Sequence, residues 1–390
     1  MSTHDEHTPV VIIGAGVAGL TVGNLLLRNG IGCIILERRT RTYVESRQRA
    51  GTIDTRGVRM FREWGLSEVV EGDAISQGEG GFWIDETVLP LDLDDEGESV
   101  YCPQQILVRN LTDVFLRSGG DLRYEAEGIV LSDLDGPTAH VTYERHGQTV
   151  QVATELVAGC DGDRGVSRES IPDGVLTRYA REYAYSWLSV LAEVPTRPSG
   201  MAIHDRGLAG MIPRGPQASR LYLQIPTTDT AADWSPERIW DEVQARFGPD
   251  TPVDRGPIVS SVVVPLRSVV FEPMRHGTLF LLGDAAHIVP PMSAKGINLA
   301  LHDAETFVRG VVAQINDADP TVLERYSDDA LRHVWNYQAF AVWITDTMHD
   351  AGDASYAGAF AKQVARAELQ RQFASPTATA LFAELTSGTN

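Results

Sequence analysis

The sequence predicts an α/β fold in which a parallel sheet with a glycine-rich motif is joined to an antiparallel region and a helical C-terminal part. Three observations lead to this prediction. A strand-helix-strand pattern with three spaced glycines occupies the first 37 residues. Apolar segments between Pro and Gly breaks occupy about 181–266, and helical patterns dominate from Asp303 onward. At 390 residues and 43% apolar composition, the chain can bury a substantial core and divide into two or three lobes.

The first unit contains a glycine motif between two strands. "PVVIIGAG" predicts a buried parallel strand, "VAGLTVGNLLLRNG" predicts a helix that ends at Gly30, and "IGCIILE" predicts a second buried strand that ends at Glu37. Gly14, Gly16 and Gly19 fill G-x-G-x-x-G between the first strand and the helix. The first glycine permits the tight turn, the second lets the backbone approach a pyrophosphate, and the third allows close packing of the helix on the strand.

The start of this helix is a predicted anion site. Its first turn, around Ala18, offers unpaired backbone N–H groups to a pyrophosphate. Glu37, at the end of the second strand, can accept hydrogen bonds from ribose hydroxyls. The unit is therefore predicted to be a Rossmann-like dinucleotide-binding domain.

A second acidic motif follows a buried strand late in the chain. "TLFLLGDAAH" ends this strand at Gly283-Asp284, and ligands of doubly wound sheets lie outside the carboxyl ends of the strands. Asp284 is therefore expected to face the same crevice as the glycine motif. An NAD dehydrogenase usually has no need of a second acid there, whereas the ribityl hydroxyls of FAD can donate to one. "LVAGCDGDRGVSRES" adds Asp161 at a third strand end, so the sequence favours FAD.

Composition excludes several other classes of function. Acidic residues outnumber basic residues 53 to 33, a formal charge of -20, which argues against nucleic-acid and anionic-membrane partners. The 3 cysteines are too few for a disulfide framework or a zinc site, and no clustered acid accompanies the histidines, so no metal is expected. Neither a signal peptide nor a membrane span is recognised, and a cytoplasmic location is expected.

The motifs together resemble those of the single-component (group A) flavoprotein aromatic hydroxylases, and within them the 4-hydroxybenzoate 3-monooxygenases. The resemblance covers about residues 8–345 and is carried by "VIIGAGVAGL", "LERRTRTYVESRQRAG", "CDGDRGVSRESIP", "GTLFLLGDAAHIVPP" and "AKGINLA". It implies a discontinuous FAD-binding domain over 1–72, 99–180 and 267–300. It also implies an antiparallel-sheet substrate domain over 73–98 and 181–266, and a C-terminal helical or interface region over 301–390.

The resemblance also implies the chemistry. In this family NAD(P)H reduces FAD, dioxygen forms a flavin C4a-hydroperoxide, and one oxygen atom is inserted into an aromatic substrate. The start of the helix at Lys295 and Gly296, together with the ammonium of this lysine near the N1/C2 edge of the flavin, is expected to stabilise the negative charge of the reduced flavin. By the same resemblance, Ile297 and Asn298 contact the flavin through their backbone, and Pro291 presents its carbonyl to the substrate.

Further cofactor positions carry over from the family one by one. Arg47 and Arg49 correspond to arginines near the FAD pyrophosphate, and Gln104 corresponds to a glutamine that contacts the flavin. Arg220 corresponds to the arginine that holds the flavin in its two positions. The nicotinamide cofactor is expected to bind near Arg164, Arg267, Arg38 and Tyr43. The additional charge of Arg39 favours NADPH over NADH.

The substrate pocket departs from the family pattern. Met201 stands where the family has a tyrosine that ionises a phenol, and Ile212 stands where a serine helps to bind the substrate carboxylate. The second tyrosine of the proton relay falls near Thr386. Arg214 and Tyr222, the remaining carboxylate-binding pair, are retained. The pocket has therefore lost the relay that deprotonates a phenol and part of its polarity.

Two substrate classes fit such a pocket. A bulky, apolar aromatic, indole or prenylated substrate needs no base, and hydroxylation or epoxidation of such a compound is the preferred interpretation. Alternatively, Arg214 and Tyr222 bind an aromatic acid that is electron-rich without a phenolate. A flavin oxidase or reductase and a non-catalytic flavin-binding protein are further alternatives. The spacing of Trp335, Phe340 and Trp343 indicates internal packing or the interface of a homodimer.

Overall fold

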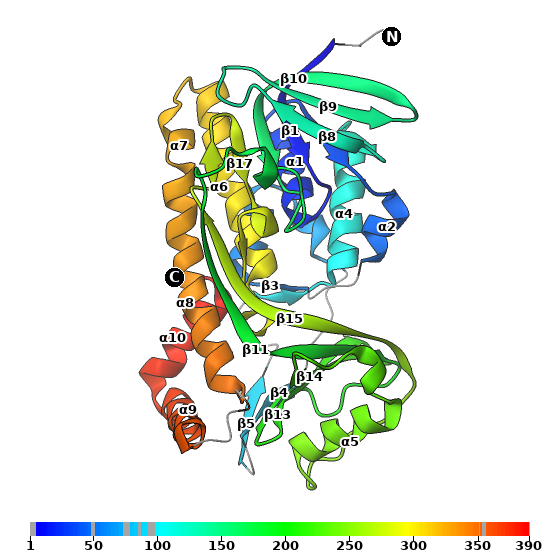
Figure 1. Cartoon of the computed structure of the whole chain (residues 1–390), viewed down its shortest axis with the longest axis vertical. Helices are drawn as coiled ribbons and strands as arrows, with labels where there is room; N and C mark the ends of the chain where they lie inside the picture. The colour runs from blue at the N-terminus through cyan, green and yellow to red at the C-terminus, as the bar shows by residue number, and fades with distance from the viewer. Residues whose placement is uncertain are drawn as a thin grey trace.

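The computed structural model describes residues 5–47, 51–72, 79–84, 87–92, 98–350, 352 and 356–389. They form two lobes, each built on its own sheet, with two long strands and a long helix running between the lobes (Figure 1). Arg49 and residues 93–97 of the acidic loop lie outside the described residues.

The first lobe contains a sheet in the order β16-β17-β10-β1-β2-β7, in which β17, β10, β1, β2 and β7 are parallel. Its central strands are buried on both faces, which explains their continuous apolar runs. β8 and β9 extend β10 as an antiparallel ribbon. The strands are β1 (Asp5–Ile13), β2 (Cys33–Glu37), β7 (Asp121–Tyr124), β8 (Glu127–Ser132), β9 (Ala139–Arg145), β10 (Gln148–Gly159), β16 (Arg275–His276) and β17 (Leu279–Leu281).

Three helices pack beside this sheet and position its carboxyl edge. α1 (Val17–Arg28) contacts both α4 (Gln104–Arg117) and α6 (Gly296–Asn316). Ten consecutive residues of α1 are buried, because the helix is enclosed by the sheet and by its two neighbours. The shorter helices α2 (Arg41–Ser46) and α3 (Thr55–Glu63) follow β2 and β3.

The second lobe contains a mostly antiparallel sheet in the order β18-β15-β11-β14-β13-β12-β4-β5. One face packs against α5 (Pro236–Phe247) in a separate apolar core, and the other face packs against the core of the first lobe. Alternate residues of each strand therefore serve the two faces. The strands are β4 (Glu79–Ile84), β5 (Thr87–Asp92), β11 (Thr177–Ala192), β12 (Gly200–His204), β13 (Gly207–Gly215), β14 (Ala218–Pro226), β15 (Ile258–Glu272) and β18 (His287–Ile288).

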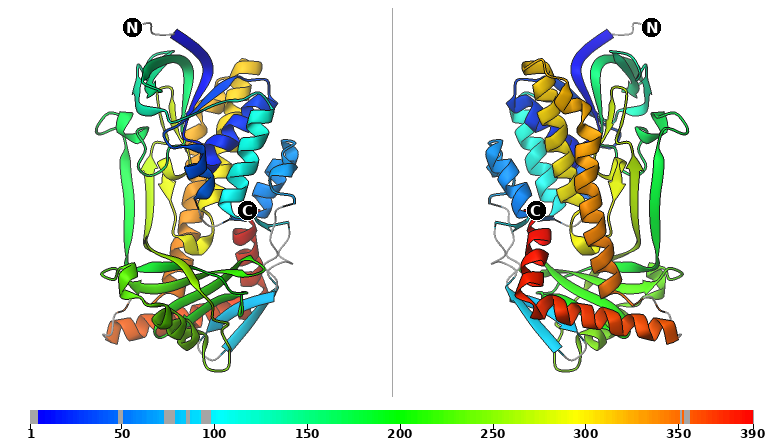
Figure 2. Two further views of the ribbon diagram at one scale, coloured as in Figure 1. Left: turned by 90° about the vertical axis from the view of Figure 1, so that its right-hand side faces the viewer. Right: turned by 90° about the vertical axis from the view of Figure 1, so that its left-hand side faces the viewer.

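The C-terminal helices connect the two lobes. α7 (Thr321–Glu324) leads into α8 (Tyr326–Met348), which runs along the side of both lobes (Figure 1). α9 (Tyr356–Ala374) lies beside the second lobe, and α10 (Pro376–Ser387) turns back, so that the C-terminus lies between the lobes (Figure 2). The two-stranded ribbon of β3 (Thr52–Ile53) and β6 (Val100–Tyr101) also lies in this central region.

Candidate active site

The glycine motif lies where β1 ends and α1 begins. Gly14 has a φ of 104°, and a Cβ there would lie 2.5 Å from the carbonyl oxygen of Cys160, so only glycine fits this turn. A Cβ at Gly19 would lie 2.0 Å from the carbonyl oxygen of Gly14, which explains the close packing of α1 on β1. A Cβ at Gly16 would meet nothing within 4 Å, and α1 begins without a side-chain cap. The first N–H groups of α1, which include that of Ala18, are therefore left without a side-chain cap beside open space at Gly16, as an anion site requires.

The carboxyl ends of neighbouring strands bring the acidic motifs to the same edge. β17, β10, β1 and β2 are adjacent and parallel, so the segments with Asp284, Asp161, the glycine motif and Glu37 follow one another along the edge. A Cβ at Gly283 would lie 3.6 Å from the Cβ of Ala18, so the turn that carries Asp284 directly contacts α1. The structure thus unites the two motifs on which the prediction of FAD depends.

Two of these acids hold backbone in place. Glu37 accepts hydrogen bonds from the backbone N–H groups of Ala15 at 3.0 Å and Arg39 at 2.8 Å. Oδ2 of Asp161 accepts from the backbone N–H and the hydroxyl of Ser167, both at 2.9 Å. Burial raises the pKa of Asp161, and the bonds from Ser167 oppose this rise. Both acids therefore shape the binding loops, and their contacts with a cofactor stay predictions.

Arginines fix the loops after β10 and β17. Nη1 of Arg168 donates to the carbonyls of Asp284–Ala285 at 3.2 and 2.8 Å, which ties the two loops together. Asp163 pairs with Arg168 and with Arg267. Arg164 in the same loop is exposed. Arg164 and Arg267, two of the four residues expected at the nicotinamide site, therefore lie in or beside this loop, and Arg267 is already paired with Asp163.

The other expected cofactor residues lie around α2 and at the start of α4. Arg38, Tyr43 and Arg47 are exposed, and the Tyr43 ring centroid lies 5.2 Å from the guanidinium of Arg39. Gln104 is the first residue of α4 and is half-buried. Their roles stay predictions.

Lys295 is oriented differently from the expectation. Its side chain is 2% exposed, and Nζ lies 2.8 Å from Oδ2 of Asp54, which is 5% exposed. Nζ also donates to the backbone carbonyl of Thr386 at 2.8 Å and lies 4.8 Å from the ring centroid of Tyr337. Burial lowers the pKa of Lys295, and the charge of Asp54 opposes this effect. The expectation of an ammonium directed at the flavin edge is therefore corrected: its charge is compensated by Asp54 inside the protein.

The loop before α6 carries the remaining predicted flavin contacts. The carbonyl of Pro291 accepts from the backbone N–H of Ala294 at 3.0 Å, so one of its lone pairs is used within its own turn. α6 begins at Gly296 without a side-chain cap, which leaves N–H groups of the first turn, near Ile297, for a ligand. The side chain of Asn298 is used to bind the backbone of β3 and of its own turn.

The predicted substrate residues share one face of the second sheet. Met201 pairs with Gly210, Gly210 with Tyr222, and Ile212 with Arg220, and paired residues of adjacent strands point to the same side. A Cβ at Gly210 would lie 2.4 Å from Sδ of Met201 and 3.5 Å from Cδ2 of Tyr222. This face is the one that packs toward the first lobe, since Met201 and Tyr222 contact its core. The strand register alone therefore brings four predicted residues to the same face: Met201, Ile212, Arg220 and Tyr222.

Arg214 is a half-buried cation whose charge has no counterpart in the described part of the chain. Nη2 lies 3.5 Å from the hydroxyl of Tyr222, but the buried Nε and Nη1 have no hydrogen-bond partner among the described residues. The guanidinium lies 5.0 Å from the ring centroid of Tyr101. Burial lowers the pKa of Arg214, and the nearby charge of Arg220 lowers it further, while Nη1 of Arg220 donates to Ser189 at 3.3 Å. An anion is the partner that this arrangement lacks.

Comparison with known proteins identifies the family of this chain. A family model described as an FAD binding domain matches residues 7–341. The chain belongs to this FAD-binding family. The chain is 34% identical over 349 residues to the p-hydroxybenzoate hydroxylase of Acinetobacter baylyi, a match that covers 88% of this chain and 86% of that protein. It is 24% identical to a probable NADH-specific resorcinol 4-hydroxylase of Rhodococcus jostii, over 83% of this chain and 62% of that protein.

Solved structures show the same fold. The crystal structure of p-nitrophenol 4-monooxygenase PnpA from Pseudomonas putida matches with a TM-score of 0.81 at 17% identity, and covers 98% of this chain and 99% of that chain. Aklavinone-11 hydroxylase with FAD and aklavinone matches with a TM-score of 0.76 at 21% identity, over 89% of this chain and 70% of that chain. The predicted family, fold class and flavin-dependent monooxygenase class are confirmed. The open space at Gly16 and the uncapped start of α1 fit FAD.

Sequence reasoning missed a group of residues beside Tyr222 on the substrate face of the second sheet. The ring centroid of Trp187 lies 4.6 Å from that of Tyr222. Nε1 of Trp187 donates to Nε2 of His349 at 2.7 Å, and Nδ1 of His349 lies 2.8 Å from the carbonyl of Thr345. Burial lowers the pKa of His349 to about 4, so this imidazole is neutral at pH 7 and accepts from the indole. No local pattern signals this contact, because its two residues come from β11 and from the end of α8.

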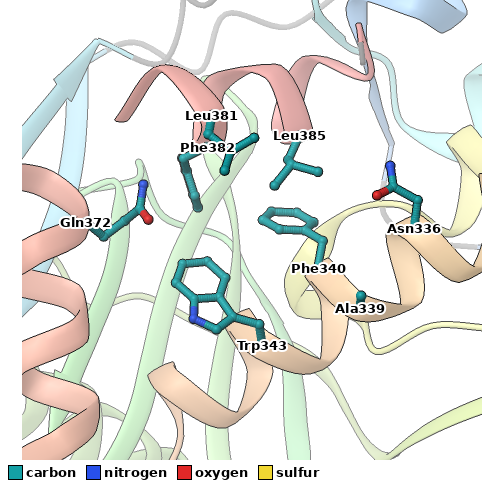
Figure 3. Close-up of a pocket in the computed structure, with 8 residues that line it drawn as sticks. All are labelled: Asn336, Ala339, Phe340, Trp343, Gln372, Leu381, Phe382 and Leu385. Carbon is teal, nitrogen blue, oxygen red and sulfur yellow. The ribbon is translucent and has the colours of Figure 1, made fainter. Parts of the chain in front are cut away.

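The aromatic residues of α8 lie apart from the predicted site. Phe340 and Trp343 line a hollow of about 250 Å³ between α8, α9 and α10, together with Phe382 and apolar neighbours (Figure 3). None of the predicted cofactor or substrate residues lines it. Trp335 is 40% exposed and packs edge-on against Tyr179. Phe340 and Trp343 therefore serve internal packing, and the interface of a homodimer stays a prediction.

Two expectations concern absences. Within the described ranges, no group of three or more His, Cys, Asp or Glu side chains is arranged to hold a metal ion. His287 instead pairs with the buried Asp303 at 2.7 Å. Among those same residues, no helix has the length and apolar character needed to span a membrane. The hydroxyl of Thr386 donates to the carbonyl of Phe382 at 2.9 Å within α10, and the loss of the family's proton relay stays a prediction.

Proposed function

We propose that this monooxygenase inserts one atom of dioxygen into an aromatic acid whose ring is activated by a neutral donor such as an amino group. Arg214 is the observation that carries the proposal, because its Nε and Nη1 are buried without a partner among the described residues. Burial of an unpaired guanidinium is unfavourable, and a substrate carboxylate would restore the missing hydrogen bonds. The hydroxyl of Tyr222, 3.5 Å from Nη2, is placed to contact the same group.

The nature of the ring follows from Met201. A thioether does not accept a proton from a phenol, so this position supplies no base for a phenolate. An amino group donates electron density to the ring without losing a proton, and the ring then needs no such base. Arg214 would orient the substrate, while the apolar Met201 and Ile212 would exclude water from the reacting face.

The cofactors complete the proposal. FAD, when bound, supplies the activated oxygen after reduction by NADPH or NADH. The N–H groups at the start of α1 would bind its pyrophosphate, and Asp284 would accept from its ribityl hydroxyls. The loop with Arg164, beside Arg267, would receive the nicotinamide cofactor during reduction.

A second candidate is the oxygenation of a bulky, apolar indole or prenylated aromatic. It is supported by Met201 and Ile212, which place apolar side chains on the same face as Tyr222. Under this alternative Arg214 would not contact the substrate, and its buried nitrogens would have to be satisfied by water.

The experiment measures oxidation of NADPH and NADH by the FAD-loaded protein with a panel of aromatics. The panel contains 4-aminobenzoate, 4-hydroxybenzoate and indole, and each acid is paired with its carboxamide. We expect aminated acids to stimulate oxidation and to gain one oxygen atom, their carboxamides to be inactive, and 4-hydroxybenzoate to react poorly. Stimulation by indole or by the carboxamides as strong as that by the acids would overturn the proposal in favour of the apolar alternative.

A further inference from the structure

We propose that Tyr101 is a further substrate-binding residue, whose hydroxyl donates a hydrogen bond to the anionic group that Arg214 binds. This inference rests on the proposed function, because it names a second contact to the carboxylate of the aromatic acid. It adds a residue from the ribbon between the lobes to a site that otherwise belongs to the second sheet.

Tyr101 is buried, yet its polar end is unsatisfied. Its side chain lies on β6, which pairs with β3 through Thr52, and it is 3% exposed. The hydroxyl is buried and has no hydrogen-bond partner in the described part of the chain. Most buried side-chain hydroxyls in proteins are paired, because an unpaired one loses its bonds to water. A ligand that binds here would therefore find a donor ready.

The position of Arg214 indicates what this ligand is. Its guanidinium carbon lies 5.0 Å from the Tyr101 ring centroid, so the cation rests against the aromatic ring. The hydroxyl is carried by the same ring against which the guanidinium rests, so the two groups belong to one small region of the site. The unpartnered groups near one another are all donors: Nε and Nη1 of Arg214 and the hydroxyl of Tyr101.

A carboxylate matches this set of donors. It offers two oxygens with about four acceptor positions, which suffices for two bonds from Arg214, one from Tyr101 and one from Tyr222. An uncharged carboxamide offers a single acceptor oxygen and places an N–H₂ group against a cation. The arrangement therefore selects a planar anion over its neutral isostere.

The experiment compares Tyr101→Phe with the unaltered FAD-loaded protein. Binding of 4-aminobenzoate and of 4-aminobenzamide is titrated through the change in flavin absorbance, and the Tm is measured without ligand. We expect the substitution to weaken binding of the acid by about 10- to 100-fold, the range for a lost hydrogen bond to a charged group, and to change binding of the amide much less. The Tm should be unchanged or higher, because an unpaired hydroxyl leaves a buried site.

A matched control is Tyr143→Phe, which removes another buried phenol hydroxyl, one that interacts with Arg123 on β7. It should leave binding of both compounds unchanged. Equal affinity of Tyr101→Phe and the unaltered protein for the acid would overturn the role of Tyr101 and leave the proposed function intact. Loss of FAD or a lower Tm in Tyr101→Phe would show a structural role instead. Failure of the unaltered protein to bind the acid, with binding of the amide retained, would overturn both proposals.

Discussion

The ion pair between Lys295 and Asp54 makes a quantitative prediction for Lys295→Met. The methionine side chain has nearly the same length, but it removes the charge that compensates Asp54 and the donor that binds the carbonyl of Thr386. The two side chains are 2% and 5% exposed, so water cannot take over either role. The variant therefore leaves a buried carboxylate without a counter-charge.

The size of the effect follows from this burial. Removal of one partner from a buried ion pair costs about 3–5 kcal/mol of unfolding free energy. An unfolding entropy of about 2.1 cal/mol/K per residue, applied to the 390 residues as one cooperative unit, converts this cost into a Tm lower by about 4–6 °C. Differential scanning calorimetry of the FAD-loaded protein is the assay.

Two further variants separate the ion pair from the side chain itself. The double variant Lys295→Met with Asp54→Asn removes both charges, and the asparagine oxygen can still cap α3 by accepting from the N–H of Gly57, as Asp54 does at 2.9 Å. It should recover most of the lost Tm. Lys362→Met is the matched control, because this lysine is 28% exposed and pairs with Asp350 at 3.0 Å and with Asp205 at 3.1 Å, so its loss should cost no more than about 2 °C.

The reasoning would be refuted by either of two results. One is a Tm for Lys295→Met within experimental error of that for Lys362→Met. The other is a double variant whose Tm is no higher than that of Lys295→Met alone, since removal of the uncompensated carboxylate should then have restored stability.

Three other predictions concern the two binding regions. Gly16→Ala should change the Tm by less than about 1 °C but weaken FAD binding at least about 10-fold, because its Cβ enters the open space of the turn. Gly14→Ala should instead lower the Tm by several degrees, and equal effects of the two variants on the Tm would contradict this prediction. Arg214→Met should maintain or raise the Tm of the ligand-free protein and abolish the preference for an acid over its carboxamide, and a clear loss of Tm would instead indicate an unrecognised internal partner. His349 has a pKa of about 4 in the folded state against 6.5 when unfolded, so protonation of this group should lower the unfolding free energy by on the order of 3 kcal/mol from pH 6.5 to pH 4. His349→Gln should flatten that part of the pH profile in urea titrations, and an unaltered slope would rule out this role of His349.

The cofactor edge was predictable because its determinants are local or follow from general rules for sheets. The spacing of Gly14, Gly16 and Gly19 depends on one turn, and the structure shows the packing that this spacing serves. The place of Asp284 beside that turn follows from the rule that ligands lie at the carboxyl ends of parallel strands. The alternating pattern of the second sheet likewise predicted antiparallel strands there.

The remaining features depend on contacts between distant segments. Lys295 was expected at the flavin because it begins a helix there, but its direction is set by Asp54 and by the end of α10, and neither is signalled by the sequence around it. The support of Trp187 by His349, and the lack of a partner for Arg214 among the described residues, are also tertiary properties. A residue type is visible in a sequence, but whether a buried charge is compensated depends on everything that packs around it.

The two long strands limit how this enzyme can open. β11 and β15 form one antiparallel ladder from Thr177 and Glu272, beside the first lobe, to Ala192 and Ile258 in the second, and it is shared by both halves of the molecule. Backbone hydrogen bonds on either side of an interruption hold the two strands together as a stiff beam, so a wide opening between the halves would have to break some of them. The irregularity between Glu182 and Ser186 is where such a beam bends most easily. Any chimaera that exchanges one half must therefore keep the register of both strands.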